Sequence, residues 1–408
     1  MKIFIMGLTP FAHNRGVSAM VSTTIREIKE EYPNCEIVIW GGFPEPDLPI
    51  PTSMEYRKYK SSIQYIKSKW DLSFYRQLFW MPIRILSIFG WKKDLVIREL
   101  MESDLVLSFN YGDIFSDVHS FYNIGTILRN ILPILGRKRI IFAPQTIGPF
   151  KRKSFEIIAR WILNNPHVGV IMPRDPMSYK WLKSNIHNKG KIIFCQDMAF
   201  LLKPAKIPSI IVRDILDTGY ISICLNPYQV PSHSYKKTVK ILGDVLDNLV
   251  NQTDKYIVFI PHATAEGFDC RDMAEDIKKY VSQKDKLIII KKDIYTTEEL
   301  KAIIANSDAL ISFLTHPIIA ALSSGVPVIG ISSKSPKMLP IMSMFDMDDY
   351  VIFLDSLIKN PNILKSKLKD IISTDTREKL STKLKNKQQI IELEVKKKFR
   401  EAIKNANS

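Results

Sequence analysis

Apolar runs of four to six residues recur along the chain, and longer stretches of mixed polarity separate them. Their richness in Ile, Val, Leu and Phe is typical of strands buried on both faces of a sheet. In the first half they predict strands at Lys2–Met6, Glu36–Trp40, Leu105–Ser108, Ile140–Ala143, Val168–Met172 and Ile192–Cys195. In the second half they predict strands at Ile221–Leu225, Tyr256–Ile260, Leu287–Ile290, Ala309–Ser312, Val326–Ile331 and Val351–Leu354. Strands that alternate with helical stretches predict parallel sheets covered by helices on both faces.

The alternating pattern is interrupted once, by the proline-containing stretch Leu202–Pro208, and then restarts. A chain of 408 residues is also too long for one ordinary core. We therefore predict an α/β protein with two Rossmann-like domains, residues 1–203 and 204–375. The remaining residues, 376–408, predict a basic helix that has no strand after it and is free to pack back across the domain junction.

Composition narrows the class of protein. The chain has no run of 18 apolar residues, which a membrane-spanning helix would need, and it opens on a strand rather than on a signal peptide. Four scattered cysteines without CxxC spacing fit buried thiols in a reducing cytoplasm better than disulfides or a zinc site. We therefore expect a cytoplasmic protein that holds no metal.

The net charge of +16 indicates an anionic partner. Arg57–Lys93 carries nine basic residues and one acidic residue, together with nine Phe, Tyr and Trp side chains. No nucleic-acid-binding motif surrounds this stretch, so we expect no nucleic acid. Residues 74–90 predict either an amphipathic helix packed in the first domain or a surface that touches an anionic membrane at its inner face. For the basic tail we favour a helix whose charged face is exposed to solvent over a binding surface for an anion.

Ligands of open α/β sheets bind beyond the carboxyl ends of the strands, so the loops after the strands hold the candidate site residues. In the first domain these candidates are Asn14, Arg15, Gly112, Asp113, Gln145 and Arg174. Asn14 and Arg15 stand before a glycine at a strand-to-helix turn, where backbone N–H groups can approach an anion or a sugar hydroxyl. Asp113 can deprotonate a sugar hydroxyl or cap the next helix, and Arg174 can bind an anion or pair with Asp175.

In the second domain the candidates are His262, His316, Ser333, Lys334 and Lys337. Each histidine directly follows an apolar strand, which places both at one sheet edge. His316 also begins a helix whose positive end favours a phosphate or carboxylate. Ser333, Lys334 and Lys337 follow the next strand, and the lysines are either anion ligands or solvated loop residues.

No HExxH, GxSxG, P-loop, dinucleotide fingerprint or paired-cysteine motif occurs. We therefore expect no cofactor. The order of the remaining motifs resembles the polysaccharide pyruvyl transferase family over about residues 1 to 340. The segments that carry the resemblance are "NRG" at 14–16, "GDIFSD" at 112–117, "QTIGPF" at 145–150, "RD" at 174–175, "QDMAFLL" at 196–202, "IPH" at 260–262, "YTTEELKAIIANSDALIS" at 295–312, His316 and "ALSSGVPVIGIS" at 321–332.

The resemblance implies a GT-B-like fold, in which two Rossmann-like domains face each other across a cleft. It implies transfer of a pyruvyl group from phosphoenolpyruvate to two hydroxyls of a glycan or lipid-linked sugar, forming a ketal. The donor would bind mainly to the second domain and the sugar to the first. His316 matches the family's functional histidine and would act as the acid or hold the phosphate. His262, Arg174 and Lys337 would bind the anion, and Asp113 would accept the hydroxyl proton.

One position departs from the family pattern. Members commonly have an arginine two residues before this histidine, where this chain has Leu314. Leucine cannot bind an anion, so three explanations stay open. A lysine such as Lys334 or Lys337 binds the anion in place of the arginine, the donor differs, or the chain is a diverged member with weak or no transferase activity.

Two other functions stay open from the sequence. A GT-B glycosyltransferase that uses a nucleotide sugar would often carry an acidic residue late in the second domain, and none follows Gly325 as far as Met338. A diverged glycan-binding protein without activity would make the aromatic and basic stretch its main feature.

Overall fold

The structure, a computed structural model, describes residues 1–10, 14–41, 53–67, 74–90, 94–112, 114–117, 124–264, 269–291, 295–333 and 338–407. Its internal contacts divide the chain into two compact units. The first unit comprises Met1–Ala12, Met20–Met198 and Leu393–Ser408, and the second comprises His13–Ala19 and Ala199–Glu392. The predicted domain boundary after residue 203 lies close to Met198. Each unit also contains a segment that is distant in sequence from the rest of it.

The first unit is built on a six-stranded parallel sheet with the order β3-β2-β1-β4-β5-β6. Its strands are β1 (Lys2–Met6), β2 (Glu36–Gly41), β3 (Ile63–Lys67), β4 (Leu105–Ser108), β5 (Ile140–Gln145) and β6 (Val168–Pro173). The central strands are buried along almost their whole length, as their continuous apolar runs predict.

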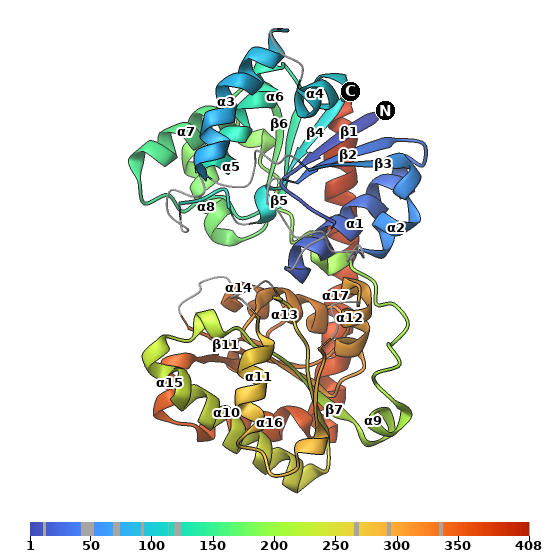
Figure 1. The fold of residues 1–408 in the computed structure, drawn as a ribbon, viewed down its shortest axis with the longest axis vertical. Coiled ribbons are helices and arrows are strands. Elements are labelled where there is room, and N and C mark those ends of the chain that lie inside the picture. Colours follow the sequence, from blue (N-terminus) through green and yellow to red (C-terminus); the bar gives the residue numbers. More distant parts are fainter. Residues whose placement is uncertain are drawn as a thin grey trace. The chain divides into compact units, whose positions relative to one another are not determined.

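Helices cover both faces of this sheet. They are α1 (Arg15–Glu31), α2 (Met54–Lys58), α3 (Phe74–Ile88), α4 (Leu95–Glu102), α5 (Ile124–Arg129), α6 (Ile131–Leu135), α7 (Lys153–Asn164) and α8 (Pro176–Asn185). In Figure 1, α3, α5, α6 and α7 gather on one face of the strands. The core on that face includes Phe4, Val106, Phe142 and Ile162, all fully buried.

The second unit repeats this design, with a six-stranded parallel sheet in the order β12-β11-β10-β7-β8-β9. If the strands of each unit are numbered in chain order, both sheets have the order 3-2-1-4-5-6. The strands are β7 (Tyr220–Cys224), β8 (Tyr256–Phe259), β9 (Leu287–Ile289), β10 (Ala309–Ser312), β11 (Val328–Ser332) and β12 (Val351–Phe353). The predicted pair of parallel α/β sheets is therefore confirmed.

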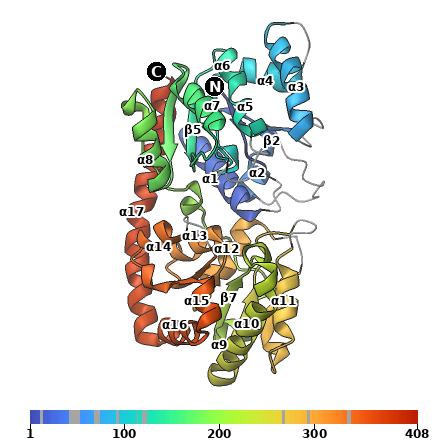
Figure 2. The same cartoon turned by 90° about the vertical axis from the view of Figure 1, so that its left-hand side faces the viewer.

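Its helices are α9 (Arg213–Thr218), α10 (Ser232–Thr253), α11 (Arg271–Lys278), α12 (Thr297–Ala305), α13 (Thr315–Leu322), α14 (Met338–Ser343), α15 (Leu354–Lys359), α16 (Asn362–Ile372) and α17 (Thr374–Asn407). Within this unit α12, α13 and α14 pack next to one another, and α10 packs against α11 (Figure 2). Right-handed crossovers place these two groups on opposite faces of the sheet.

From Leu384 onward, one side of helix α17 is buried and mostly apolar. Leu384, Val395 and Phe399 on that side are fully buried. Gln388 donates a hydrogen bond to the carbonyl of Phe200 within the second unit (2.9 Å). Further along the helix, Arg400 forms ion pairs with Glu27 (2.6 Å) and Glu30 (2.5 Å) of the first unit's α1. The helix α17 covers most of the segment 376–408 for which a terminal helix was predicted.

In the first unit, one predicted strand is absent and one observed strand was not predicted. Residues 192–195 run beside β6, where Ile193 and Cys195 donate backbone hydrogen bonds to Ile171 (3.0 Å) and Pro173 (3.1 Å), but they form only an isolated bridge. The observed β3 was not predicted, because "IQYIK" alternates weakly inside a basic stretch. Among the described residues, no helix is long and apolar enough to cross a membrane.

Candidate active site

The two predicted histidines of the second unit lie at the carboxyl edge of its sheet. His262 follows β8, and His316 is the second residue of α13, which directly follows β10. Leu314 is the N-cap residue of α13 and provides no side-chain hydrogen bond to the helix. The serine at the end of β10 fixes this turn instead, because Ser312 Oγ accepts from the Leu314 N–H (3.0 Å).

The start of α1 belongs to the same site. Asn14 forms an antiparallel bridge with Ala263, and the Arg15 N–H donates to the His262 carbonyl at 3.2 Å. The Asn14 side chain accepts from the Gly16 N–H at 3.0 Å, so it orders the first turn of the helix. The predicted residues Asn14 and Arg15 are therefore next to His262 in the structure, although they are far from it in sequence.

Gly16 is in close contact with His316. A Cβ atom added at Gly16 would lie 2.1 Å from His316 Nδ1, far inside van der Waals contact. Only a residue without a side chain fits at this position while the imidazole keeps its place. The structure thus brings together the "NRG" loop and the predicted histidine.

Arg15, His262 and His316 line a cavity with Lys301 of α12, and its remaining walls come from Ala19, Ala199, Leu202, Thr297 and Ala320. With its open rim, which includes solvent, the cavity spans about 270 Å³. Thr297 and Lys301 were not predicted as site residues, although both lie in the "YTTEELKAIIANS" segment. Lys301 is buried, and its ammonium donates to the Leu202 carbonyl and to Ser323 Oγ (2.6 Å).

Burial keeps His262 neutral. Its side chain is 6% exposed, and desolvation, followed by the charges of His316 and Arg15, lowers the pKa of His262 from 6.5 to about 3. Neither ring nitrogen has a hydrogen-bond partner among the described residues. As a neutral imidazole, His262 can offer one N–H donor and one acceptor to a ligand, but it cannot supply a positive charge.

The carboxyl edge of the first sheet holds a different arrangement. Gln145, at the end of β5, accepts from Asn110 Nδ2 (2.9 Å) and donates to the Ser108 carbonyl (2.6 Å). Asn130 donates to Asn110 Oδ1 (3.0 Å) and accepts from Ser108 Oγ (2.6 Å). All four side chains are essentially fully buried. The predicted residue Gln145 is thus part of a closed network of amides and a hydroxyl.

Gly112 and Arg174 lie together beside this network. Gly112 has φ +85°, and a Cβ there would lie 3.0 Å from the Arg174 guanidinium. Arg174 forms an ion pair with Asp197 and donates to Thr146 Oγ1 at 3.2 Å. Asp175, the neighbour considered as its partner, instead caps α8 by accepting from the Ser178 N–H (2.8 Å).

Of the four remaining predicted site residues, the structure describes one. Ser333 directly follows β11 and is half-buried. Asp113, Lys334 and Lys337 lie outside the described residues. No group of three or more metal-ligating side chains occurs in the part of the chain that the structure describes.

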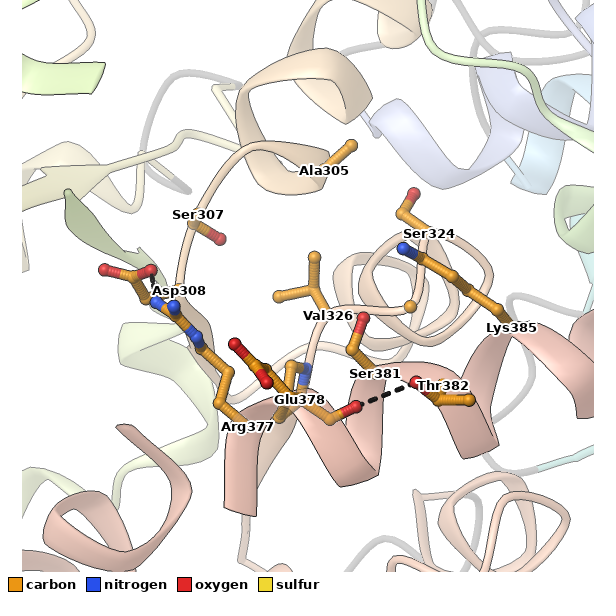
Figure 3. Close-up of a pocket in the computed structure, with 12 residues that line it drawn as sticks. Ala305, Ser307, Asp308, Ser324, Val326, Arg377, Glu378, Ser381, Thr382 and Lys385 are labelled. Carbon is orange, nitrogen blue, oxygen red and sulfur yellow. Dashed lines mark hydrogen bonds and ion pairs between the residues drawn. The ribbon is translucent and has the colours of Figure 1, made fainter. Parts of the chain in front are cut away.

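A larger groove, of about 460 Å³, lies at the amino edge of the second sheet, before β10 and β11. Asp308 there pairs with Arg377 of α17, while Lys385 and Ser381 project from the same helix (Figure 3). Asp308 also binds Lys255 Nζ at 2.6 Å. Since ligands of open α/β sheets bind at the opposite edge, this polar groove anchors α17 and is not the candidate active site.

Several solved structures share this fold. A UDP-GlcNAc 2-epimerase from Methanocaldococcus jannaschii has a TM-score of 0.58 and 13% identity, with 96% of this chain and 99% of that one covered. The Neisseria meningitidis epimerase bound to UDP-GlcNAc has the same TM-score and identity, with coverages of 96% and 98%. HepE of Anabaena, in complex with UDP, has a TM-score of 0.57 and 13% identity, covering 99% and 100%.

At these identities the likeness defines the fold, which is the GT-B-like class of paired Rossmann-like domains. No curated protein matches the chain. The family model of polysaccharide pyruvyl transferases matches residues 14–335, which include the Arg15 segment and both histidines. The chain therefore belongs to the polysaccharide pyruvyl transferase family.

Proposed function

We propose that the protein transfers a pyruvyl group from phosphoenolpyruvate to two hydroxyls of a glycan or lipid-linked sugar, forming a pyruvate ketal. The observation that carries this proposal is the cavity at the carboxyl edge of the second sheet. Its lining includes Arg15, Lys301 and two histidines, and it includes no carboxylate. An anionic donor fits such a lining, because its charge would be matched by cationic and N–H donors.

The chemistry assigns a role to each group. Protonation of the donor's methylene carbon leaves an electron-poor centre at the adjacent carbon, which a sugar hydroxyl attacks with loss of its proton. The carbon–oxygen bond to phosphate breaks, phosphate leaves with the electron pair, and the second hydroxyl closes the ketal. His316 is the proposed acid, since imidazole exchanges protons near neutral pH. Asp113 is the proposed base, and Ser333, Lys334 and Lys337 are the proposed phosphate ligands.

The acceptor is proposed to bind the first unit. Its carboxyl edge presents Gly112 and the paired Arg174, beside amide groups that are already satisfied. Such a surface has no excess charge, which suits a neutral sugar better than a phosphate. In this proposal Gln145 holds the strand ends in place, and Arg174 orients the acceptor through its ordered position.

A direct assay tests the reaction. The purified protein is incubated with phosphoenolpyruvate and a panel of glycan and nucleotide-sugar acceptors, and phosphate release and the added mass of the pyruvyl group are followed. Phosphoenolpyruvate is also expected to raise the melting temperature. No binding at millimolar phosphoenolpyruvate, with clear binding of a UDP-sugar, would instead favour a nucleotide-sugar enzyme, the activity named for the structural neighbours. Binding of glycan without turnover would favour a diverged binding protein.

We also propose that the protein acts in the cytoplasm, against the inner face of the membrane. The four cysteines are free and buried, as expected in a reducing compartment. Helix α3 exposes Phe79 (70% exposed) and Leu86 (40%), and Phe89, which directly follows the helix, is 63% exposed. Because the segment Arg57–Lys93 is strongly basic, an anionic bilayer that carries a lipid-linked acceptor would complement it.

Vesicle sedimentation tests the membrane proposal. Binding to vesicles with anionic lipid is expected, and it should weaken as salt is raised. Replacing both Phe79 and Phe89 with Ser should reduce binding, whereas Phe353→Ser, an exposed phenylalanine of the second unit, should not. Absence of vesicle binding at low salt would refute the proposal and leave the transferase reaction unaffected.

A further inference from the structure

Helix α7 carries an exposed pair of large apolar side chains. Ile157 is 58% exposed and Trp161 is 51% exposed, and because the two are four residues apart they lie next to each other on one side of the helix. The opposite side of α7, which includes Phe155 and Ile162, is buried in the core of the first unit. One exposed apolar side chain is ordinary, but an adjacent isoleucine and tryptophan on one helix face indicate a contact surface.

Helix α7 belongs to the same helical layer as α3. Helix α5 packs against both of them, and all three cover one face of the first sheet (Figure 1). On α3, Ile85 and Ile88 pack against the core that α7 also covers, whereas Phe79 and Leu86 are exposed. The outer side of this layer therefore presents apolar side chains from two separate helices.

The layer is also basic. Residues 151–164 include four basic residues and one acidic residue, Glu156. Lys153 and Arg160 are exposed on either side of Ile157, and Arg160 Nη1 lies 3.9 Å from the Glu156 carboxylate. Helices α3, α5 and α6 contain no acidic residue, and the two glutamates of the neighbouring α4 both pair with Lys2. An anionic partner would therefore meet little repulsion at this surface.

The kind of partner follows from the residue types and their spacing. Tryptophan beside lysine and arginine on an amphipathic helix is typical of helices that lie in the interface of a membrane. The exposed apolar side chains of α3 and α7 project at separate places, because α5 lies between the two helices. A lipid bilayer yields around each projecting side chain, whereas a folded protein would need a matching pocket for each.

We infer that α7 inserts Ile157 and Trp161 into an anionic lipid bilayer, where Lys153 and Arg160 contact the phosphates of the headgroups. This inference rests on the proposed membrane contact of α3 and extends it to a second helix. Two helices that touch the bilayer at separate places fix the tilt of the first unit on it, which one helix alone would leave free.

This orientation bears on the acceptor. Asp117, in the segment that follows β4, accepts hydrogen bonds from the N–H groups of Lys151 (2.7 Å) and Arg152 (2.6 Å), so it ties the start of α7 to the carboxyl side of the first sheet. The membrane contact would then reach the edge at which the acceptor is proposed to bind. A sugar carried by a membrane lipid suits this arrangement.

Sedimentation with two kinds of vesicle tests the inference, one of phosphatidylcholine alone and one that also contains phosphatidylglycerol. The double variant Ile157→Ser/Trp161→Ser should bind the anionic vesicles about 10-fold more weakly than the wild type, because two apolar side chains no longer leave water. Phe353→Ser/Ile390→Ser is the matched control, since these side chains of the second unit are 50% and 60% exposed. Its vesicle binding should equal that of the wild type.

A second variant tests the charges. Lys153→Ala/Arg160→Ala should weaken binding to the anionic vesicles by about 10-fold and leave binding to phosphatidylcholine vesicles unchanged. High salt should remove the difference from the wild type. If Ile157→Ser/Trp161→Ser loses its cooperative thermal transition, this variant decides, and an unaltered affinity for anionic vesicles would overturn the inference.

The remaining outcomes separate the inference from the proposed function. If Ile157→Ser/Trp161→Ser binds vesicles as the wild type does, while Phe79→Ser/Phe89→Ser does not, α7 stays in water and the proposed contact through α3 stands. If the wild-type protein binds no vesicles at low salt, the proposed membrane contact is itself wrong. If Ile157→Ser/Trp161→Ser changes a dimer into a monomer in size-exclusion chromatography and leaves vesicle binding intact, the surface binds a second copy of the chain and the inference is overturned.

Discussion

The two sheets have the same strand order, yet the polar groups at their carboxyl edges differ in kind. In the first unit Arg174 is paired with Asp197, and the amides of Asn110, Asn130 and Gln145 satisfy one another. In the second unit Arg15 and Lys301 face a cavity without a carboxylate lining, beside a neutral His262.

In the proposed reaction, the two copies of this architecture would each bind one of the two substrates. A closed amide network has no electrostatic need for a ligand, so in the proposed reaction it would form a rigid wall beside a neutral sugar. A cavity lined by basic side chains and imidazoles attracts anions, so in the proposed reaction it would suit the donor. Function therefore follows from the groups placed on the edges, because the fold alone is common to both.

The largest expected effect tests whether the second edge carries the chemistry. His316→Ala removes the proposed acid, and turnover should fall by about 100- to 10,000-fold, the usual worth of general acid catalysis. Phosphate release measures turnover, and an unchanged melting temperature shows that the fold is intact. His233→Ala, an exposed histidine of the same unit, is the control. Turnover within a few-fold of wild type in His316→Ala would exclude His316 as the acid.

Gly16→Ala tests the close approach that assembles this edge. The added methyl group would collide with the His316 ring, so the ring or the start of α1 must shift. We expect turnover to fall by about 10- to 100-fold, because displacement of a catalytic group by about 1 Å costs that much. Gly169→Ala is the control, since its new Cβ would have no neighbour closer than 3.8 Å. Full activity of Gly16→Ala would mean that the His316 position is not critical.

Gln145→Ala tests the amide network at the carboxyl edge of the first sheet. It removes the Gln145 acceptor from Asn110 Nδ2, which keeps only its bond to Ser108 Oγ, and the Gln145 donor from the Ser108 carbonyl, and it leaves a buried gap, so the free energy of unfolding should fall by about 2–4 kcal/mol. Urea unfolding measures the loss, and the affinity for phosphoenolpyruvate should be unchanged. Gln283→Ala, which breaks a surface hydrogen bond to Asn251, should cost less than about 0.5 kcal/mol. A loss of donor affinity in Gln145→Ala would contradict the separation of the two edges.

The effect that is smallest near neutral pH concerns the protonation of His262. The pKa of His262 is about 3 in the folded protein and 6.5 when exposed, so the unfolded chain binds the extra proton between these values. This histidine therefore lowers stability as pH falls from about 6.5 toward 3, and its contribution is constant above 6.5. Thermal unfolding of wild type and His262→Gln across this range measures it, and the variant should show the weaker pH dependence. Equal slopes would mean that His262 is not held neutral.

Much of the fold could be predicted because continuous apolar runs identify buried strands. The same signal failed at residues 192–195, where an apolar run lies beside β6 without forming a ladder, and at β3, whose pattern is weak. Sequence also located His262 and His316, since residues after strands converge at one edge. It could not show that Gly16 touches His316, or that Lys301 lines the same cavity, because these contacts join distant segments and leave no local pattern.

The assignment of His13–Ala19 to the second unit has a consequence for how the protein is made. Arg15 leaves the ribosome early, whereas His262 and His316 follow only after the whole first sheet has been synthesised. The cavity beside the two histidines therefore cannot be completed until both parts of its unit have been synthesised, in contrast to the usual domain-by-domain order. A separately expressed fragment beginning at Ala199 would lack Arg15, and adding a peptide that spans residues 13–19 is the natural way to restore the missing wall.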